Sequence, residues 1–244
     1  MATALGAIPA LFLKRMDDER QNLLLGFAAG VMLAASFFSL ILPAIEVAEK
    51  QGAGPTLASA QVVAAVLLGA FAIARLNAWL PPPERIGLGP PGIASLSLRR
   101  VWLFVAAVTL HNFPEGMAVG VSFGGGDFAA GRVTALGIGL QNIPEGLAVA
   151  VALLSVGYRR GQAAAIAAAS GLVEPVAGLI GVSIVSVAQA FLSWGLGLAG
   201  GAMIYVVASD LIPEAHARIG GGGRVSAGLM VGLAAMMFLD TTLG

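Results

Sequence analysis

Two short segments carry the polar side chains whose types and spacing could do chemistry. HNFPEGMAVGV starts at His111, and QNIPEGLAVAV starts at Gln141, thirty residues later. The segments share Asn, Pro, Glu and Gly at matching positions. His111 and Glu115 are four residues apart, which places them on one face of a helix. Six side chains could therefore form one polar cluster: His111, Asn112, Glu115, Gln141, Asn142 and Glu145.

These side chains, with Glu174 as a seventh, predict a metal site. Glu174 precedes Pro175 and so repeats the pairing of a glutamate with a nearby proline. Oxygen and imidazole ligands suit Zn²⁺, Fe²⁺, Mn²⁺, Co²⁺ or Cd²⁺, and the absence of cysteine argues against Cu⁺. Two other interpretations stay open, a polar network that joins helices and a proton relay through the carboxylates. The chain has no HExxH motif, so an intramembrane metalloprotease has little support.

The composition indicates which solvent surrounds these residues. Of 244 residues, 58% are hydrophobic and 11% are charged, against about 45–50% and 25% in soluble domains. These values, with a mean hydropathy of +0.90, predict an all-α integral membrane protein whose partner is the lipid bilayer. Thirteen basic residues balance thirteen acidic ones, so the net charge gives no sign of a nucleic-acid partner.

The hydropathy pattern predicts eight transmembrane helices, because about 20 apolar helical residues are needed to cross the hydrocarbon. The first range is short for a crossing, so we expect that the chain starts upstream of Met1 or that this helix lies partly outside the bilayer. A cleaved signal peptide is disfavoured because the start lacks a positive region. The whole chain, 1–244, is expected to form a single transmembrane domain. The predicted helices are 1–14, 23–48, 57–80, 101–123, 132–155, 162–187, 190–212 and 225–243.

Basic residues predict the orientation of these helices. Most Lys and Arg lie in the connections after the first, third, fifth and seventh helices, whereas the alternate connections carry only Lys50 and Arg132. Cytoplasmic loops are the ones enriched in Lys and Arg. Both termini are therefore expected outside. The Pro- and Gly-rich segment 81–100 is expected to be a flexible cytoplasmic loop.

The two motifs are predicted to form an inverted repeat at the bilayer midplane, because consecutive membrane helices run antiparallel. At 1.5 Å per residue, each motif starts about 15 Å into its helix, and Glu174 lies about 18 Å into the sixth. One charge at this depth costs at least about 2.5–3.5 kcal/mol. A compensating cation explains three carboxylates there better than either alternative. Pro114 and Pro144 each free a backbone carbonyl beside the cluster.

Two further groups of side chains suggest routes to and from the cluster. The second predicted helix carries the candidates for an entrance path: Met32, Ser36, Ser39 and Glu46. The alternative is a packing face of small residues with a solvated Glu46. The seventh helix ends in the candidates for an exit path: Asp210, Glu214 and His216. The alternative there is interfacial capping. Asp240, near the outer end of the last helix, is interpreted as structural.

The HNFPEG, QNIPEG and SGLVEP segments resemble those of the ZIP (Zrt/Irt-like) family of divalent metal transporters, close to its bacterial members. The resemblance covers nearly the whole chain. It implies eight helices with both termini outside and a binuclear metal site between helices 4 and 5. His111, Glu115, Gln141 and Glu145 would form the primary site. Asn112, Asn142 and Glu174 would form the second site, with Glu115 and Glu145 bridging.

The chain departs from the family pattern at three places. Close bacterial relatives have aspartate at the position of Asn142, so the second site is expected to be weaker here. Ser209 stands where close relatives have a ligating histidine, which weakens the expected exit site. The 81–100 segment lacks the histidine-rich run of many relatives, and the chain has only two histidines.

The function expected from these features is secondary transport of a divalent metal into the cytoplasm of a bacterium through its plasma membrane. Zinc is the expected metal. The resemblance implies alternating access, with one helix bundle sliding against the other. The chain has no P-loop, and we expect neither an enzyme activity nor an organic cofactor. One or two metal ions would be the substrate, and Gly- and Ala-rich surfaces permit a homodimer. The alternatives are a metal-selective channel and a non-transporting helical scaffold with a polar core.

Overall fold

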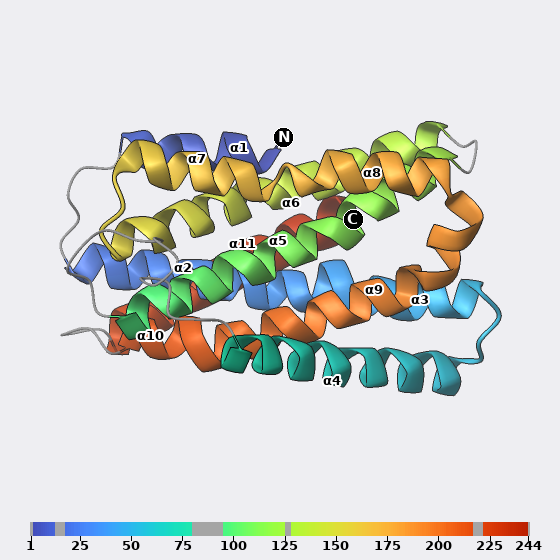
Figure 1. Cartoon of the computed structure of the whole chain (residues 1–244), viewed down its shortest axis with the longest axis horizontal. Helices are drawn as coiled ribbons and strands as arrows, with labels where there is room; N and C mark the ends of the chain where they lie inside the picture. Colours follow the sequence, from blue (N-terminus) through green and yellow to red (C-terminus); the bar gives the residue numbers. More distant parts are fainter. Residues whose placement is uncertain (1, 13–17, 80–94, 125–127, 217–221, 244) are drawn as a thin grey trace.

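A computed structural model describes residues 2–12, 18–79, 95–124, 128–216 and 222–243 of the chain. Every regular element in this part is helical (Figure 1). The elements are α1 (Ala2–Ala7), η1 (Ile8–Leu11), α2 (Asp18–Ala35), η2 (Ser36–Ile41), α3 (Leu42–Lys50), α4 (Pro55–Trp79), α5 (Ser95–Gly124), α6 (Phe128–Ser155), α7 (Arg160–Ser170), α8 (Val173–Ser183), α9 (Val185–Val206), η4 (Val207–Leu211), α10 (Ile212–His216) and α11 (Gly222–Leu243).

Within the described residues, six helical stretches are long and apolar enough to cross a membrane, as expected of a multi-pass membrane protein. They are Asn22–Lys50, Pro55–Arg75, Gly131–Ser155, Arg160–Ser183, Val187–Leu211 and Gly222–Thr242. Each overlaps one of the eight predicted helices. The remaining two predicted helices correspond to the short apolar stretch Ala2–Leu11 and to α5, which is 30 residues long and carries the HNFPEG motif.

Two predicted boundaries change in the structure. α5 begins at Ser95, and Leu98 in its first turns is buried. Residues 95–100 are therefore helix and not part of a flexible loop, while 80–94 lie outside the described residues. The sixth predicted helix is divided into α7 and α8 by a turn at Gly171–Leu172. This turn places Glu174 in the first turn of α8.

The helices pack in two groups (Figure 1). The first group contains α1, α5, α6, α7 and α8, and the second contains α2, α3, α4, α9, α10 and α11. Within the groups, α1 packs on α6, α5 on α8, α2 on α11 and α4 on α9. Contacts of α5 with α9 and of α2 with α6 join the two groups. The polar motifs of α5 and α6 therefore lie where the groups meet.

Glycines allow two of these helix pairs to approach closely. A Cβ atom at Gly116 of α5 would overlap the backbone carbonyl of Glu174 in α8, and one at Gly146 of α6 would overlap that of Thr3 in α1. Close backbone approach through small residues is typical of membrane helix pairs. Gly116 and Gly146 occupy matching positions in the two motifs, so each motif is backed by a partner helix in the same way.

π-Helical turns interrupt α2 and α9, a feature that the sequence analysis did not predict. η2 precedes Pro43, and η4 precedes Pro213. Each proline lacks an N–H group and its ring clashes with the carbonyl four residues earlier, so a wider turn relieves the clash. α5 and α6, in contrast, stay α-helical through Pro114 and Pro144.

Candidate metal centre

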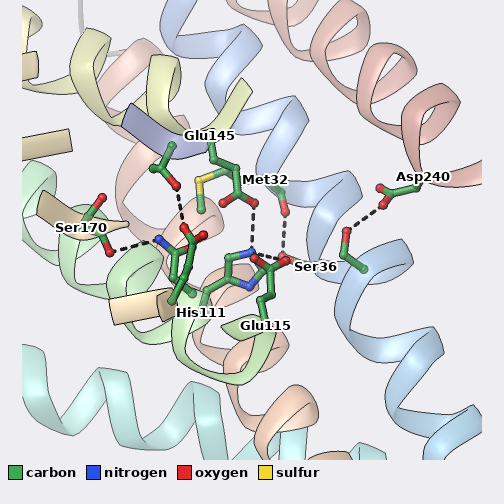
Figure 2. Close-up of polar contacts among 11 residues, drawn as sticks. Met32, Ser36, His111, Glu115, Glu145, Ser170 and Asp240 are labelled. Carbon is green, nitrogen blue, oxygen red and sulfur yellow. Dashed lines mark hydrogen bonds and ion pairs between the residues drawn. The ribbon is translucent and has the colours of Figure 1, made fainter. Parts of the chain in front are cut away.

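Three side chains from the two motifs meet in the interior (Figure 2). His111 and Glu115 come from α5, and Glu145 comes from α6. His111 Nε2 lies 2.9 Å from Glu145 Oε1 and 3.2 Å from Glu115 Oε1. All three residues are buried, and one ligand atom from each lies within 4.8 Å of the others. This spacing allows the three side chains to hold one metal ion.

The cluster contains many polar atoms without a hydrogen bond in the structure. A buried donor or acceptor without a partner costs about 1–3 kcal/mol, and more when it is charged. Folded proteins therefore have few such atoms, and several in one place call for an ion or another ligand. The atoms are His111 Nδ1, Asn112 Oδ1, both oxygens of Glu115, Glu145 Oε2 and both polar atoms of the Asn142 amide.

The two asparagines of the motifs have different surroundings. Asn112 Nδ2 donates a hydrogen bond of 3.2 Å to the carbonyl oxygen of Ser170, the last residue of α7. Asn142 makes no hydrogen bond with either amide atom, although it is fully buried. The side chain of Gln141, which we predicted as a ligand, lies outside the described residues.

Glu174 is not one of the three residues whose ligand atoms lie within 4.8 Å of one another. Its Oε1 accepts a hydrogen bond of 2.6 Å from the hydroxyl of Thr3 in α1. It also lines a cavity of about 330 Å³ between α1, α5, α6 and α8. A second site as predicted would therefore include a carboxylate whose Oε1 already accepts the hydroxyl of Thr3.

The residues of the predicted entrance path lie at increasing exposure along α2, η2 and α3. Met32 and Ser36 are fully buried, and the Ser36 hydroxyl donates 2.7 Å to the carbonyl oxygen of Met32. Figure 2 shows Met32 beside Glu145. Ser39 is half-buried, and its hydroxyl donates 2.8 Å to Asp240 Oδ1 of α11. Glu46 is exposed and lies 3.8 Å from Lys50 Nζ.

Two residues of the predicted exit path, Asp210 and His216, have described side chains, and their surroundings differ. Asp210 is buried in η4, where the Ser209 hydroxyl donates 2.7 Å to its Oδ2. His216 is exposed, and its Nδ1 lies 2.9 Å from the carbonyl oxygen of Ile212 in the same helix. The side chain of Glu214 lies outside the described residues.

Comparisons with known proteins point to one family. Residues 92–240 match the family described as ZIP Zinc transporter. The chain is 43% identical to Zinc transporter GufA of Myxococcus xanthus, over all of this chain and 95% of that protein. It is 49% identical to Zinc transporter ZIPB of Bordetella bronchiseptica, over all of this chain and 78% of that protein.

A vertebrate relative is also similar over most of its length. Zinc transporter ZIP11 of Homo sapiens is 35% identical over 90% of this chain and 87% of that protein. The family match includes both motifs and Glu174, the segments on which the resemblance was based. The resemblance is therefore confirmed, and the chain belongs to the ZIP family of metal transporters.

Proposed function

We propose that this protein is a secondary transporter that carries a divalent transition metal into the cytoplasm across a bacterial plasma membrane, with zinc as the preferred metal. The single observation that carries the proposal is the buried group of His111, Glu115 and Glu145 with its unpaired polar atoms. The names of the bacterial relatives support zinc as the metal.

The charge of the group favours a divalent ion. Two ionised glutamates and a neutral histidine carry two negative charges, which one divalent cation balances. A monovalent cation would leave one negative charge uncompensated in a medium of low dielectric, where isolated charges are costly. Imidazole nitrogen and carboxylate oxygen are also normal zinc ligands, and zinc prefers four of them. Gln141 or a water molecule would supply the fourth.

A second metal ion would be held by Asn112, Asn142 and Glu174, with Glu115 and Glu145 bridging the two ions. Asn142 supplies a neutral amide, and Oε1 of Glu174 already accepts the hydroxyl of Thr3. This site would therefore bind more weakly than the first.

The metal would enter from the outer mouth near Glu46 and leave past Asp210. The proposed topology has eight membrane helices and both termini outside. Six of them are the long apolar stretches, and the other two are the short helix that begins with α1 and the helix α5. Alternating access would move the first helix group against the second. The fully buried Met32 and Ser36 next to the group of three support a carrier more than an open channel.

Zinc uptake into liposomes of purified protein tests the proposal. We expect uptake that saturates with external zinc and is accelerated by zinc trapped on the opposite side, as a carrier requires. The double variant Glu115→Gln/Glu145→Gln should abolish it. The matched control is Glu49→Gln, which removes one exposed carboxylate of α3 and should keep full uptake. Wild-type protein that inserts but moves no zinc would contradict the proposed function, and uptake that never saturates would favour a channel.

A further inference from the structure

Thr3 is the only polar residue of α1, and it is fully buried between other helices. A Cβ atom at Gly146 of α6 would overlap the backbone carbonyl of Thr3. A Cβ atom at Gly171, in the turn between α7 and α8, would overlap the side chain of Thr3. The two glycines therefore make room for Thr3 on two sides, and the packing fixes where its hydroxyl lies.

The hydroxyl of Thr3 is used differently from other hydroxyls in these helices. Ser36, Thr109 and Ser122 each donate to a carbonyl oxygen one turn earlier in their own helical stretch, which is a usual solution for serine and threonine in a helix. The hydroxyl of Thr3 donates instead to Oε1 of Glu174 in α8, over 2.6 Å. This length is typical of a hydroxyl that donates to a carboxylate. The contact therefore links α1 to a candidate metal ligand.

Thr3 and Glu174 occupy corresponding places in the inverted repeat. Gly116 of α5 packs against the backbone of Glu174, and its counterpart Gly146 of α6 packs against the backbone of Thr3. The relation of α1 to α6 is therefore the same as that of α8 to α5. One of the two corresponding positions carries a carboxylate and the other carries a hydroxyl, and these two side chains bond to each other.

The segment that carries Glu174 is also held from the side of the group of three. Asn112 of α5 donates a hydrogen bond to the carbonyl oxygen of Ser170, the last residue before the turn (Figure 2). Glu174 interacts electrostatically with two residues of the group of three. With Asn112 on one side of the turn and Thr3 on the other, two different helices determine where this carboxylate lies.

A hydrogen bond to one carboxylate oxygen does not remove the carboxylate as a ligand. Each oxygen has two lone pairs, so Oε1 of Glu174 can accept from Thr3 while the carboxylate binds an ion. Carboxylates that ligate metals are commonly hydrogen-bonded to a neighbouring group, which fixes their orientation. Loss of such a neighbour typically lowers metal affinity or activity by about 10–100-fold.

We propose that Thr3 is a positioning residue for the second metal ion, and that its hydroxyl holds the carboxylate of Glu174 in the orientation that binds this ion. The inference rests on the proposed function, and within it on the second site. It gives α1 a role in metal binding although Thr3 itself ligates no metal. Without the hydroxyl, the carboxylate has to be ordered when the ion binds, and this ordering lowers the affinity.

Zinc calorimetry on purified protein tests the inference, because one titration measures both sites. Thr3→Val keeps the branched shape without the hydroxyl and should weaken the second site by about tenfold or more. The affinity of the first site should stay within about threefold of wild type, which also shows that the variant is folded. Thr3→Ser keeps the hydroxyl and should hold the second site within about threefold. The control Thr109→Val removes a hydroxyl that donates within α5 and should change neither affinity.

A double variant separates the positioning of Glu174 from a general effect on packing. Glu174→Gln alone should weaken the second site, because it removes a charged ligand. Adding Thr3→Val should then change the affinity by less than about twofold, since the ligand that Thr3 positions is already lost. Additive effects would overturn the inference. Thr3→Ala, whose side chain is smaller, provides the same comparison if Thr3→Val does not fold.

The outcomes separate this inference from the proposed function. An unchanged second site in Thr3→Val, or an equal loss in Thr3→Ser, overturns the positioning role and leaves transport untouched. Wild-type protein that moves zinc but binds only one equivalent overturns the inference together with the second site. Wild-type protein that moves no zinc contradicts the proposed function, and the binding measurements then decide on Thr3 by themselves.

Discussion

The two copies of the repeated motif pack against their partner helices in the same way but present different polar side chains. Gly116 of α5 packs against the backbone of α8, and Gly146 of α6 packs against that of α1. The α5 copy supplies both His111 and Glu115 to the group of three, whereas the described part of the α6 copy supplies Glu145 alone. Asn112 is tied to Ser170, but Asn142 makes no hydrogen bond. Among the described side chains, the two copies therefore share the way they pack but differ in the polar groups that they present.

The largest expected effect follows from removing the charge that each copy contributes. Glu115→Ala and Glu145→Ala should each reduce zinc uptake roughly 100-fold or more, since each leaves the cation undercompensated at a depth where a charge costs about 2.5–3.5 kcal/mol. Membrane insertion should be normal. Uptake into liposomes, corrected for the amount of inserted protein, measures this effect. Wild-type uptake by both variants would rule out the group as the metal site.

Because Gly116 and Gly146 pack in the same way, adding a methyl group at either position should lower the stability of the protein by a similar amount. Gly116→Ala and Gly146→Ala each place a methyl group against a backbone carbonyl. Each should destabilise the protein by about 1–3 kcal/mol, the usual cost of overpacking. Gly161→Ala is the control, because a Cβ there meets no atom within 4 Å. Thermal unfolding in detergent would show this effect. A loss of stability in only one of the two variants would contradict equivalent packing of the two copies.

The two asparagines should respond in opposite ways to the same substitution. Asn142→Asp adds a charge at a position without hydrogen bonds, so it should tighten the second metal site and make its affinity more dependent on pH. Asn112→Asp replaces a donor with a carboxylate that faces the carbonyl of Ser170, and should cost about 1–3 kcal/mol of stability. Calorimetric stoichiometry and affinity at two pH values, with thermal unfolding, would separate them. If Asn142→Asp changes none of these quantities, Asn142 does not face a metal.

The smallest effect concerns the histidine that only the α5 copy has. Protonation removes the ligand lone pair of His111 and adds a positive charge, so zinc affinity should fall as the pH drops. Bound zinc competes with the proton and moves the transition to lower pH. Calorimetric affinities from pH 7.5 to 5 should therefore decline, and a constant affinity over this interval would contradict His111 as a ligand.

Features encoded in short windows of sequence could be predicted. Apolar runs are local, and the six long apolar stretches each overlap a predicted helix. The spacing within each motif is also local, and it indicated that His111 and Glu115 share a face. The family followed from the motifs and is confirmed by the comparisons.

Contacts between distant residues could not be predicted in the same way. Thr3 and Glu174 are 171 positions apart, and Ser39 and Asp240 are 201 apart. No local periodicity encodes such pairs, since they depend on how whole helices pack. Pro43 and Pro213 were visible in the sequence, but whether a proline produces a π-helical turn or none, as at Pro114, depends on the helices around it.

The most direct test of the central claim is zinc X-ray absorption on purified protein that holds one equivalent of zinc. The chain has only two histidines, His111 and His216, so each can be removed in turn. We predict the scattering of one imidazole with oxygen ligands in wild type and in His216→Ala, and its loss in His111→Ala. Imidazole scattering that persists in His111→Ala, or is absent from wild type, would contradict a metal centre built on His111, Glu115 and Glu145.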